Sequence, residues 1–117
     1  DFGLQRNTKK ALELFQLSTQ QGLPQSQYKL AECYELGQLG LETNSKKALE
    51  LYQLSSQQGF AQAQFRLAGC YEHRKLGVEQ DENKALTFYK LSAQGGCALA
   101  QFELAQCYDL GKLGVGQ

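Results

Sequence analysis

The sequence lacks the features that mark several common classes of protein. Its formal net charge is zero, with 12 basic and 12 acidic residues. The chain therefore has neither the basic excess typical of proteins that bind nucleic acid nor an acidic excess that would favour a basic partner. No apolar run approaches the length of a membrane span, and Asp1 to Leu4 have neither the basic region nor the apolar core of a signal peptide. We predict no nucleic-acid partner and no membrane partner.

What the sequence does have is an internal repeat with a period of 37 residues. Shifted by this period, the chain aligns with itself without a gap, as the alanines Ala11, Ala48 and Ala85 illustrate. A fixed period of this size is the signature of a solenoid, in which each unit buries its apolar face against the next. Three units are about the minimum for a continuous core. We place them at about 7–43, 44–80 and 81–117.

Each unit has the pattern of two helices. A polar N-cap (Asn7, Asn44 or Asp81) precedes the first helix, which in unit one is expected through Ala11 to Gln21. A glycine then ends it. The second helices are predicted at about 24–36, 61–73 and 98–110. A loop with two glycines follows, and its leucine and valine side chains are expected under the first helix of the next unit. In unit two this loop carries His73 and Arg74, so either the turn differs there or the loop has a local role.

The chain begins and ends in the middle of this pattern, and neither end shows a polar capping unit. We therefore expect either a fragment of a longer array or a piece whose ends are covered by copies of itself. Self-association through the uncapped ends is one consequence of this interpretation.

Cysteine occurs once in each unit, at Cys33, Cys70 and Cys107, with Cys97 as an extra. Stacked units lie about 10 Å apart, whereas a disulfide needs Cα atoms within about 7 Å and zinc ligands converge at about 2.3 Å. The repeated cysteines are thus predicted to be small core hydrophobes. Free thiols favour a reducing compartment, and hence a cytoplasmic location.

Catalytic groups are sparse. The chain has one histidine, His73, and no unit can assemble a Ser/His/Asp or Cys/His set. Glu32 and Glu35 are interpreted as a solvated helix surface, not as an acid–base pair. Three aromatic ladders, one of them Phe15, Tyr52 and Tyr89, are interpreted as core, with tyrosine hydroxyls bonded at its edge. We predict no catalytic residue, no cofactor, no metal site and no enzymatic activity.

The repeat resembles the Sel1-like repeat, a relative of the tetratricopeptide repeat. The resemblance rests on the spaced Lys-Ala-Leu, Gln-Gly, Ala-Gln, Leu-Ala and Cys-Tyr positions and on the hinge from Gly77 to Asp81, followed by Lys84 and Ala85. One extra hinge residue, Leu39, Leu76 or Leu113, sets the 37-residue period. The resemblance implies an all-α, right-handed superhelix of helix pairs whose first helices line a concave surface. It also implies an adaptor or scaffold that binds proteins.

Leucine recurs on the first helices at Leu17, Leu54 and Leu91, where the family usually has a polar residue. Two interpretations are open: packing against a neighbouring helix, or an exposed apolar row that marks an interaction site. An exposed row with amides beside it would suit a peptide or helix with mixed apolar and amide contacts. The candidate partner-binding residues are Gln16, Leu17, Gln20, Gln53, Leu54, Gln57, Lys90, Leu91 and Gln94.

These observations favour a non-catalytic scaffold that binds a peptide or protein segment on its concave face. The alternatives are a regulatory or oligomerisation region of a larger multidomain enzyme, such as a kinase, and a structural spacer whose concave face binds nothing.

Overall fold

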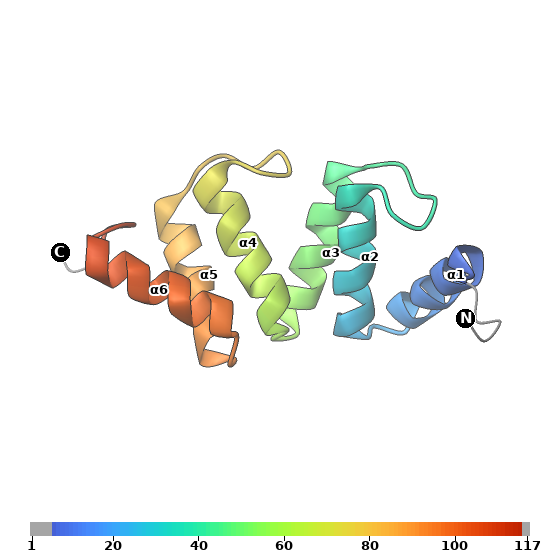
Figure 1. The fold of residues 1–117 in the computed structure, drawn as a ribbon, viewed down its shortest axis with the longest axis horizontal. Coiled ribbons are helices and arrows are strands. Elements are labelled where there is room, and N and C mark those ends of the chain that lie inside the picture. The colour runs from blue at the N-terminus through green and yellow to red at the C-terminus, as the bar shows by residue number, and fades with distance from the viewer. Residues whose placement is uncertain (1–5, 116–117) are drawn as a thin grey trace.

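Six α-helices make up the part of the chain that the structure describes. In the computed structural model, which describes residues 6–115, they are α1 (Thr8–Gln20), α2 (Pro24–Leu36), α3 (Ser45–Gln57), α4 (Ala61–His73), α5 (Glu82–Gln94) and α6 (Ala98–Leu110). No strand occurs in this range. The helices follow one another along a body of 55 × 30 × 27 Å, with α1 and α6 at opposite ends (Figure 1). The predicted all-α solenoid is confirmed, whereas Asp1 to Leu4 lie outside the described residues.

The start of each first helix follows from its cap. The side chains of Asn7, Asn44 and Asp81 each accept a hydrogen bond of 3.0 Å from the backbone N–H three residues further on, which satisfies one of the free donors at a helix start. These caps were predicted, as were the bounds of all three second helices. α1 ends at Gln20, one residue before the predicted Gln21.

The turn after the second helix needs a left-handed residue in every unit. Gly37 and Gly111 provide it with φ of 68° and 65°, and Arg74 adopts the same conformation with φ 58° and ψ 48°. The alternative that the turn differs in unit two is therefore wrong. A side chain in this conformation costs free energy that glycine avoids.

The extra hinge leucines also have positive φ, 55° at Leu39, 56° at Leu76 and 52° at Leu113. This conformation directs Leu113 into the core, where it is 6% exposed. Leu113 packs in a cluster with Ala85 and Tyr89 of α5, and Leu76 packs in the corresponding cluster around α3. The cluster of Leu76 also contains Phe88 of α5, the first helix of the next unit. Leu113 packs against α5 of its own unit. No further unit follows within residues 6–115, so at Leu113 the expectation that the loop side chains lie under the next unit stays a prediction.

The core consists of two clusters in the same register. One joins α2, α3 and α4 through Ala31, Ala48, Tyr52 and Leu67. The other joins α4, α5 and α6 through Ala68, Ala85, Tyr89 and Cys107, with Leu113 and Val115. Fully buried alanines let the second helix of one unit approach the first helix of the next closely. The main packing contacts therefore lie at the α2–α3 and α4–α5 junctions.

Candidate interaction surface on the first helices

The repeated leucines of the first helices are exposed to solvent. Leu17, Leu54 and Leu91 have exposed fractions of 54%, 46% and 42%. The interpretation that these leucines pack against a neighbouring helix is therefore wrong. They form an exposed row, and its use as an interaction site stays a prediction. In α3 the junction buries Tyr52 and Ser55 completely, and Leu54 precedes Ser55 by about 100° around the helix. The row thus lies beside the buried stripe of each first helix.

The polar candidates lie around these leucines on the same helices. Gln20, Gln57, Lys90 and Gln94 are exposed, whereas Gln16 and Gln53 are half-buried. Each first helix therefore presents an apolar side chain with amide or ammonium donors on the neighbouring turns. Lys90 is the one charged residue among the nine candidates, so contacts to them depend mainly on apolar area and hydrogen bonds.

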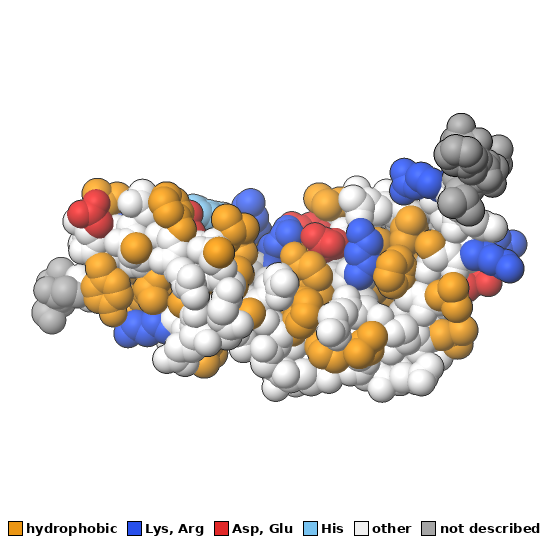
Figure 2. All heavy atoms as spheres, turned by 60° about the horizontal axis from the view of Figure 1, so that its bottom comes forward, with side chains coloured by type: hydrophobic (Ala, Val, Ile, Leu, Met, Phe, Trp, Pro, Cys, Tyr) orange, Lys and Arg blue, Asp and Glu red, His pale blue; other side chains and the backbone are white. Residues whose placement is uncertain are grey.

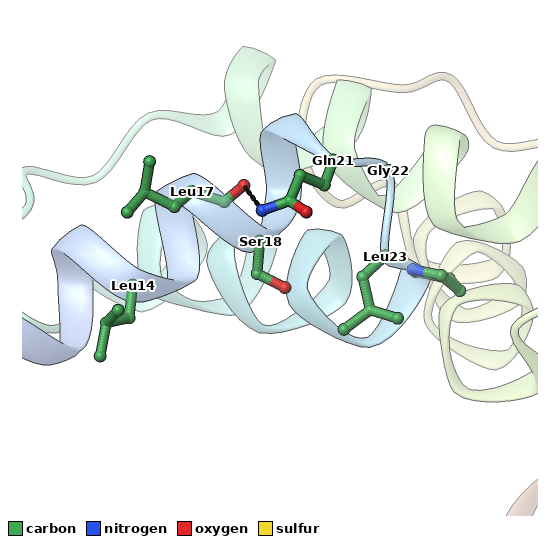
Figure 3. Close-up of a pocket in the computed structure, with 7 residues that line it drawn as sticks. Leu14, Leu17, Ser18, Gln21, Gly22 and Leu23 are labelled. Atoms are coloured by element: carbon green, nitrogen blue, oxygen red, sulfur yellow. Dashed lines mark hydrogen bonds between the residues drawn. The ribbon is translucent and has the colours of Figure 1, made fainter.

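Two hollows contain members of the row. One, of about 700 Å³, is lined by residues of α1 and its turn, Leu14, Leu17, Ser18, Gln21, Gly22, Leu23 and Pro24. In Figure 3, Leu14 and Leu23 extend to the same side of the ribbon, while the Gln21 amide folds back onto the Leu17 carbonyl. The other, of about 290 Å³, lies between α2 and α3 and is lined by Leu30, Tyr34, Lys47, Glu50, Leu51 and Leu54. Both are open, largely apolar depressions of the kind that accept side chains.

Hydrogen bonds across the junctions hold the first helices in place. The Tyr52 hydroxyl donates to Glu35 at 2.7 Å, and the Tyr89 hydroxyl donates to Glu72 at 2.6 Å. Burial, together with the bond to an acidic acceptor, raises the pKa of Tyr52 above the ordinary value for tyrosine. The predicted bonding of tyrosine hydroxyls at the edge of the core is thus confirmed at both junctions.

A second pair of bonds repeats in the same way. Ser55 Oγ donates to the Pro24 carbonyl at 2.9 Å, and Ser92 Oγ donates to the Ala61 carbonyl at 2.7 Å. Both serines are fully buried. These serines therefore tie α3 and α5 to the start of the preceding second helix.

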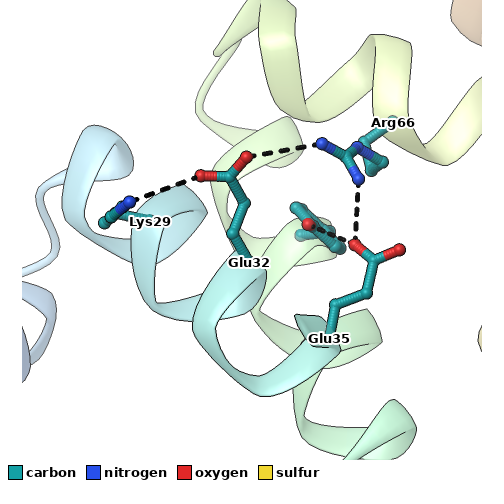
Figure 4. Close-up of polar contacts among 5 residues, drawn as sticks. Lys29, Glu32, Glu35 and Arg66 are labelled. Carbon is teal, nitrogen blue, oxygen red and sulfur yellow. Dashed lines mark hydrogen bonds and ion pairs between the residues drawn. The ribbon is translucent and has the colours of Figure 1, made fainter. Parts of the chain in front are cut away.

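Glu32 and Glu35 form an ionic bridge with Arg66, which the sequence did not indicate. Arg66 of α4 reaches Glu35 at 3.0 Å and Glu32 at 3.4 Å (Figure 4). The two glutamate side chains are 15% and 23% exposed, so the interpretation of a solvated surface was wrong. The partners are 31 and 34 residues apart in sequence, a spacing that becomes informative once the order of the helices is known. Figure 2 shows basic and acidic side chains side by side near the middle of the molecule.

The cysteines behave as the sequence predicts. Cys33, Cys70 and Cys107 are buried and all four thiols are free. Burial raises the pKa of the Cys70 thiol to about 11, which keeps it neutral and unreactive at physiological pH. Within residues 6–115, no three metal-ligating side chains come together, and no helix is long and apolar enough to cross a bilayer.

Sequence comparison identifies the repeat. The family model described as Sel1 repeat matches residues 1–23, 24–60, 61–97 and 98–117, which together span the chain. The chain belongs to the Sel1 repeat family. Sel1 repeats are in general non-catalytic modules for protein–protein interaction, a class that agrees with the predicted protein partner. The family model divides the chain between the first and second helices, at 23/24, 60/61 and 97/98.

Solved structures agree with this assignment. A Sel1 repeat protein from Oxalobacter formigenes has a TM-score of 0.80 and 27% sequence identity, over 87% of this chain and 75% of that chain. The protective antigen c5321 of uropathogenic Escherichia coli strains, which displays an SLR fold, has a TM-score of 0.79 and 32% identity. The match covers 92% of this chain and 23% of the antigen. No curated protein matches the sequence significantly.

Proposed function

We propose that this Sel1 repeat chain is a scaffold that binds an extended or helical protein segment along the exposed leucine row of its first helices. The observation that supports this most directly is the exposure of Leu17, Leu54 and Leu91, one in each unit at the same helical position. Apolar patches rimmed by polar groups commonly mark binding surfaces.

The chemistry of the row defines the partner. The open hollows beside Leu17 and Leu54 are large enough for apolar side chains, and the amides of Gln20, Gln57 and Gln94 can bond the partner's backbone. The partner is therefore expected to place leucine-like or aromatic side chains at intervals that match successive units. The row lies on the helices that line the concave face in the resemblance described above.

The test uses a displayed library of random peptides selected on the wild-type chain. Peptides that use the row should lose about tenfold or more in affinity for Leu54→Glu, because a buried carboxylate would replace an apolar contact. Leu36→Glu is the matched control, because Leu36 is a similarly exposed leucine (57%) outside the row. Fluorescence polarisation measures both affinities. Equal binding to wild type and Leu54→Glu, or failure to select any peptide, would contradict the proposal.

We also propose a reducing compartment such as the cytoplasm for this chain, because the thiols of all four cysteines are free. Tagged protein that enters an oxidising secretory compartment in cells would contradict it.

A further inference from the structure

The two ends of the solenoid expose side chains that the internal junctions bury. On α6, Phe102 is 60% exposed and Tyr108 is 56% exposed, whereas Phe65 and Tyr71 at the same positions of α4 are half-buried. Ala105 is exposed too, although its counterparts in α2 and α4 are completely buried. Within residues 6–115, no helix covers this face of α6.

The opposite end shows the complementary pattern. Leu14 of α1 is 63% exposed, whereas Leu51 and Phe88 at the same position are half-buried. Phe15 is half-buried, whereas Tyr52 and Tyr89 at its position are 0% and 3% exposed. The exposed face of α1 is thus the one that α3 and α5 use to receive the preceding second helix.

The internal junctions show which residues meet when these faces pair. Rings pair at Tyr28–Tyr52 and Phe65–Tyr89, with centroids 5.7 and 6.0 Å apart. Lysines lie over tyrosine rings at Lys47–Tyr34 and Lys84–Tyr71, at 5.3 and 5.2 Å. In each case the two members of a pair have the same separation in sequence at both junctions. The contact register is therefore a property of the repeat.

Applied to the ends, this register pairs Phe102 with Phe15 and Tyr108 with Lys10. It also brings the Ala98 carbonyl to Ser18, as Ser55 and Ser92 donate to Pro24 and Ala61. Gln101 then meets Gln21, as Gln27 accepts from Gln58 at 2.6 Å. From this complementarity we propose that the chain associates head to tail, with the α6 face of one copy packed against the α1 face of a second copy.

The tyrosine–glutamate bond is the internal contact that the end faces cannot make, and it is missing on both sides. Phe15 has no hydroxyl to donate, and Asp109 replaces the glutamate that would accept from it. A tyrosine at position 15 would bury an unsatisfied hydroxyl against the shorter aspartate, at a cost in binding. With Phe15 in place of tyrosine and Asp109 in place of glutamate, the α6–α1 contact avoids this penalty. The two differences together are consistent with these two faces meeting each other.

The proposed interface packs the α6 face of one copy against the α1 face of the next. Because such an interface joins two different faces, it leaves a free face at each end and builds chains or closed rings.

The experiment measures mass by sedimentation velocity over a wide range of concentrations. The wild-type chain should form species larger than a dimer as concentration rises. Phe102→Glu blocks the α6 face and Leu14→Glu blocks the α1 face, and each variant alone should associate about tenfold or more weakly. Mixed in equal amounts, the two variants should form a heterodimer and nothing larger, because each retains one intact and complementary face.

Leu54→Glu is the control that separates this interface from the leucine row, and it should associate like the wild type. Both blocking substitutions are at exposed positions, and circular dichroism verifies that the variants remain folded. A wild-type chain that stays monomeric at the highest concentration overturns the proposal. So does a mixture of blocked variants without a heterodimer, or association lost with Leu54→Glu and retained by the two blocking variants.

Discussion

The α2–α3 and α4–α5 junctions are built from the same repeat and differ mainly in their charged groups. Both have a buried tyrosine bonded to a glutamate, and both have a serine bonded to a backbone carbonyl. At the first junction, Arg66 adds a bridge to Glu32 and Glu35. At the second, Gly69 and Glu103 occupy the corresponding places of Glu32 and Arg66. Glu72 instead contacts the exposed His73 and Lys112.

The two junctions thus share the tyrosine and serine bonds, whereas the ionic bridge is found at one of them. In a solenoid the stability is approximately a sum of units and nearest-neighbour interfaces. The buried tyrosine, present at both junctions, should therefore carry a large share of the free energy. The ionic bridge, present at one junction, should make that junction modestly stronger than the other.

The largest effect is expected from removing the buried rings. Tyr52→Ala and Tyr89→Ala should each lower the free energy of unfolding by about 3–5 kcal/mol, because each leaves a cavity and removes the hydrogen bond to a glutamate. Phe15→Ala, at the same position of a half-buried ring, should cost about half as much. Urea unfolding monitored by circular dichroism measures all three.

Substitution by phenylalanine separates the contribution of the hydroxyl from that of the ring. Tyr52→Phe and Tyr89→Phe keep the ring and remove the hydroxyl, and should each cost about 1–2 kcal/mol. If Phe15→Ala proved as costly as Tyr52→Ala at protein concentrations where the chain is monomeric, the terminal face would be as well packed as the internal ones. The rings at positions 15 and 52 would then contribute equally to stability, which contradicts a larger contribution from the buried tyrosines.

Much of this arrangement is predictable from sequence, because it is repeated. The period, the N-caps, the second-helix bounds and the buried cysteines each follow from a pattern seen three times. The bridge made by Arg66 could not be predicted, because arginine occurs at this position in one unit alone. The equivalent residues of the other two units are Lys29 and Glu103. The exposure of Leu54 could not be predicted either, because a position at the border of an apolar stripe is covered or not according to the angle at which the neighbouring helix packs.

An intermediate effect is expected at the ionic bridge. Arg66→Met keeps the apolar stem, leaves Glu35 without a cation and leaves Glu32 with Lys29 alone, at 4.0 Å. The free energy of unfolding should therefore fall by about 1–2 kcal/mol. Because these groups are partly exposed, high salt should reduce the difference between wild type and variant. Urea unfolding at low and high ionic strength measures it.

The reverse change introduces the ionic bridge at the second junction. Glu103→Arg together with Gly69→Glu recreates the arrangement there, and a Cβ at Gly69 would meet no atom within 4 Å. Gly69→Ala is the control for the replacement of a helical glycine, which by itself should raise the free energy of unfolding by about 0.5–1 kcal/mol. The double variant should exceed Gly69→Ala in stability. A double variant no more stable than Gly69→Ala would mean that the bridge contributes nothing to a junction.

The smallest effect is expected where the loops of the two junctions differ, at Gly37 and Arg74. Arg74 has the left-handed conformation, with φ 58°. Arg74→Gly removes the strain of a side chain in this conformation and should raise the free energy of unfolding by about 1 kcal/mol. The greater entropy of glycine in the unfolded chain offsets part of this gain. Gly111→Arg is the matched opposite change, since φ is 65° and a Cβ there would meet no atom within 4 Å. It should destabilise by a similar amount. If Arg74→Gly instead destabilised the protein, Arg74 would be making a contact that outweighs its strain, and the loop after α4 would have the local role that the sequence left open.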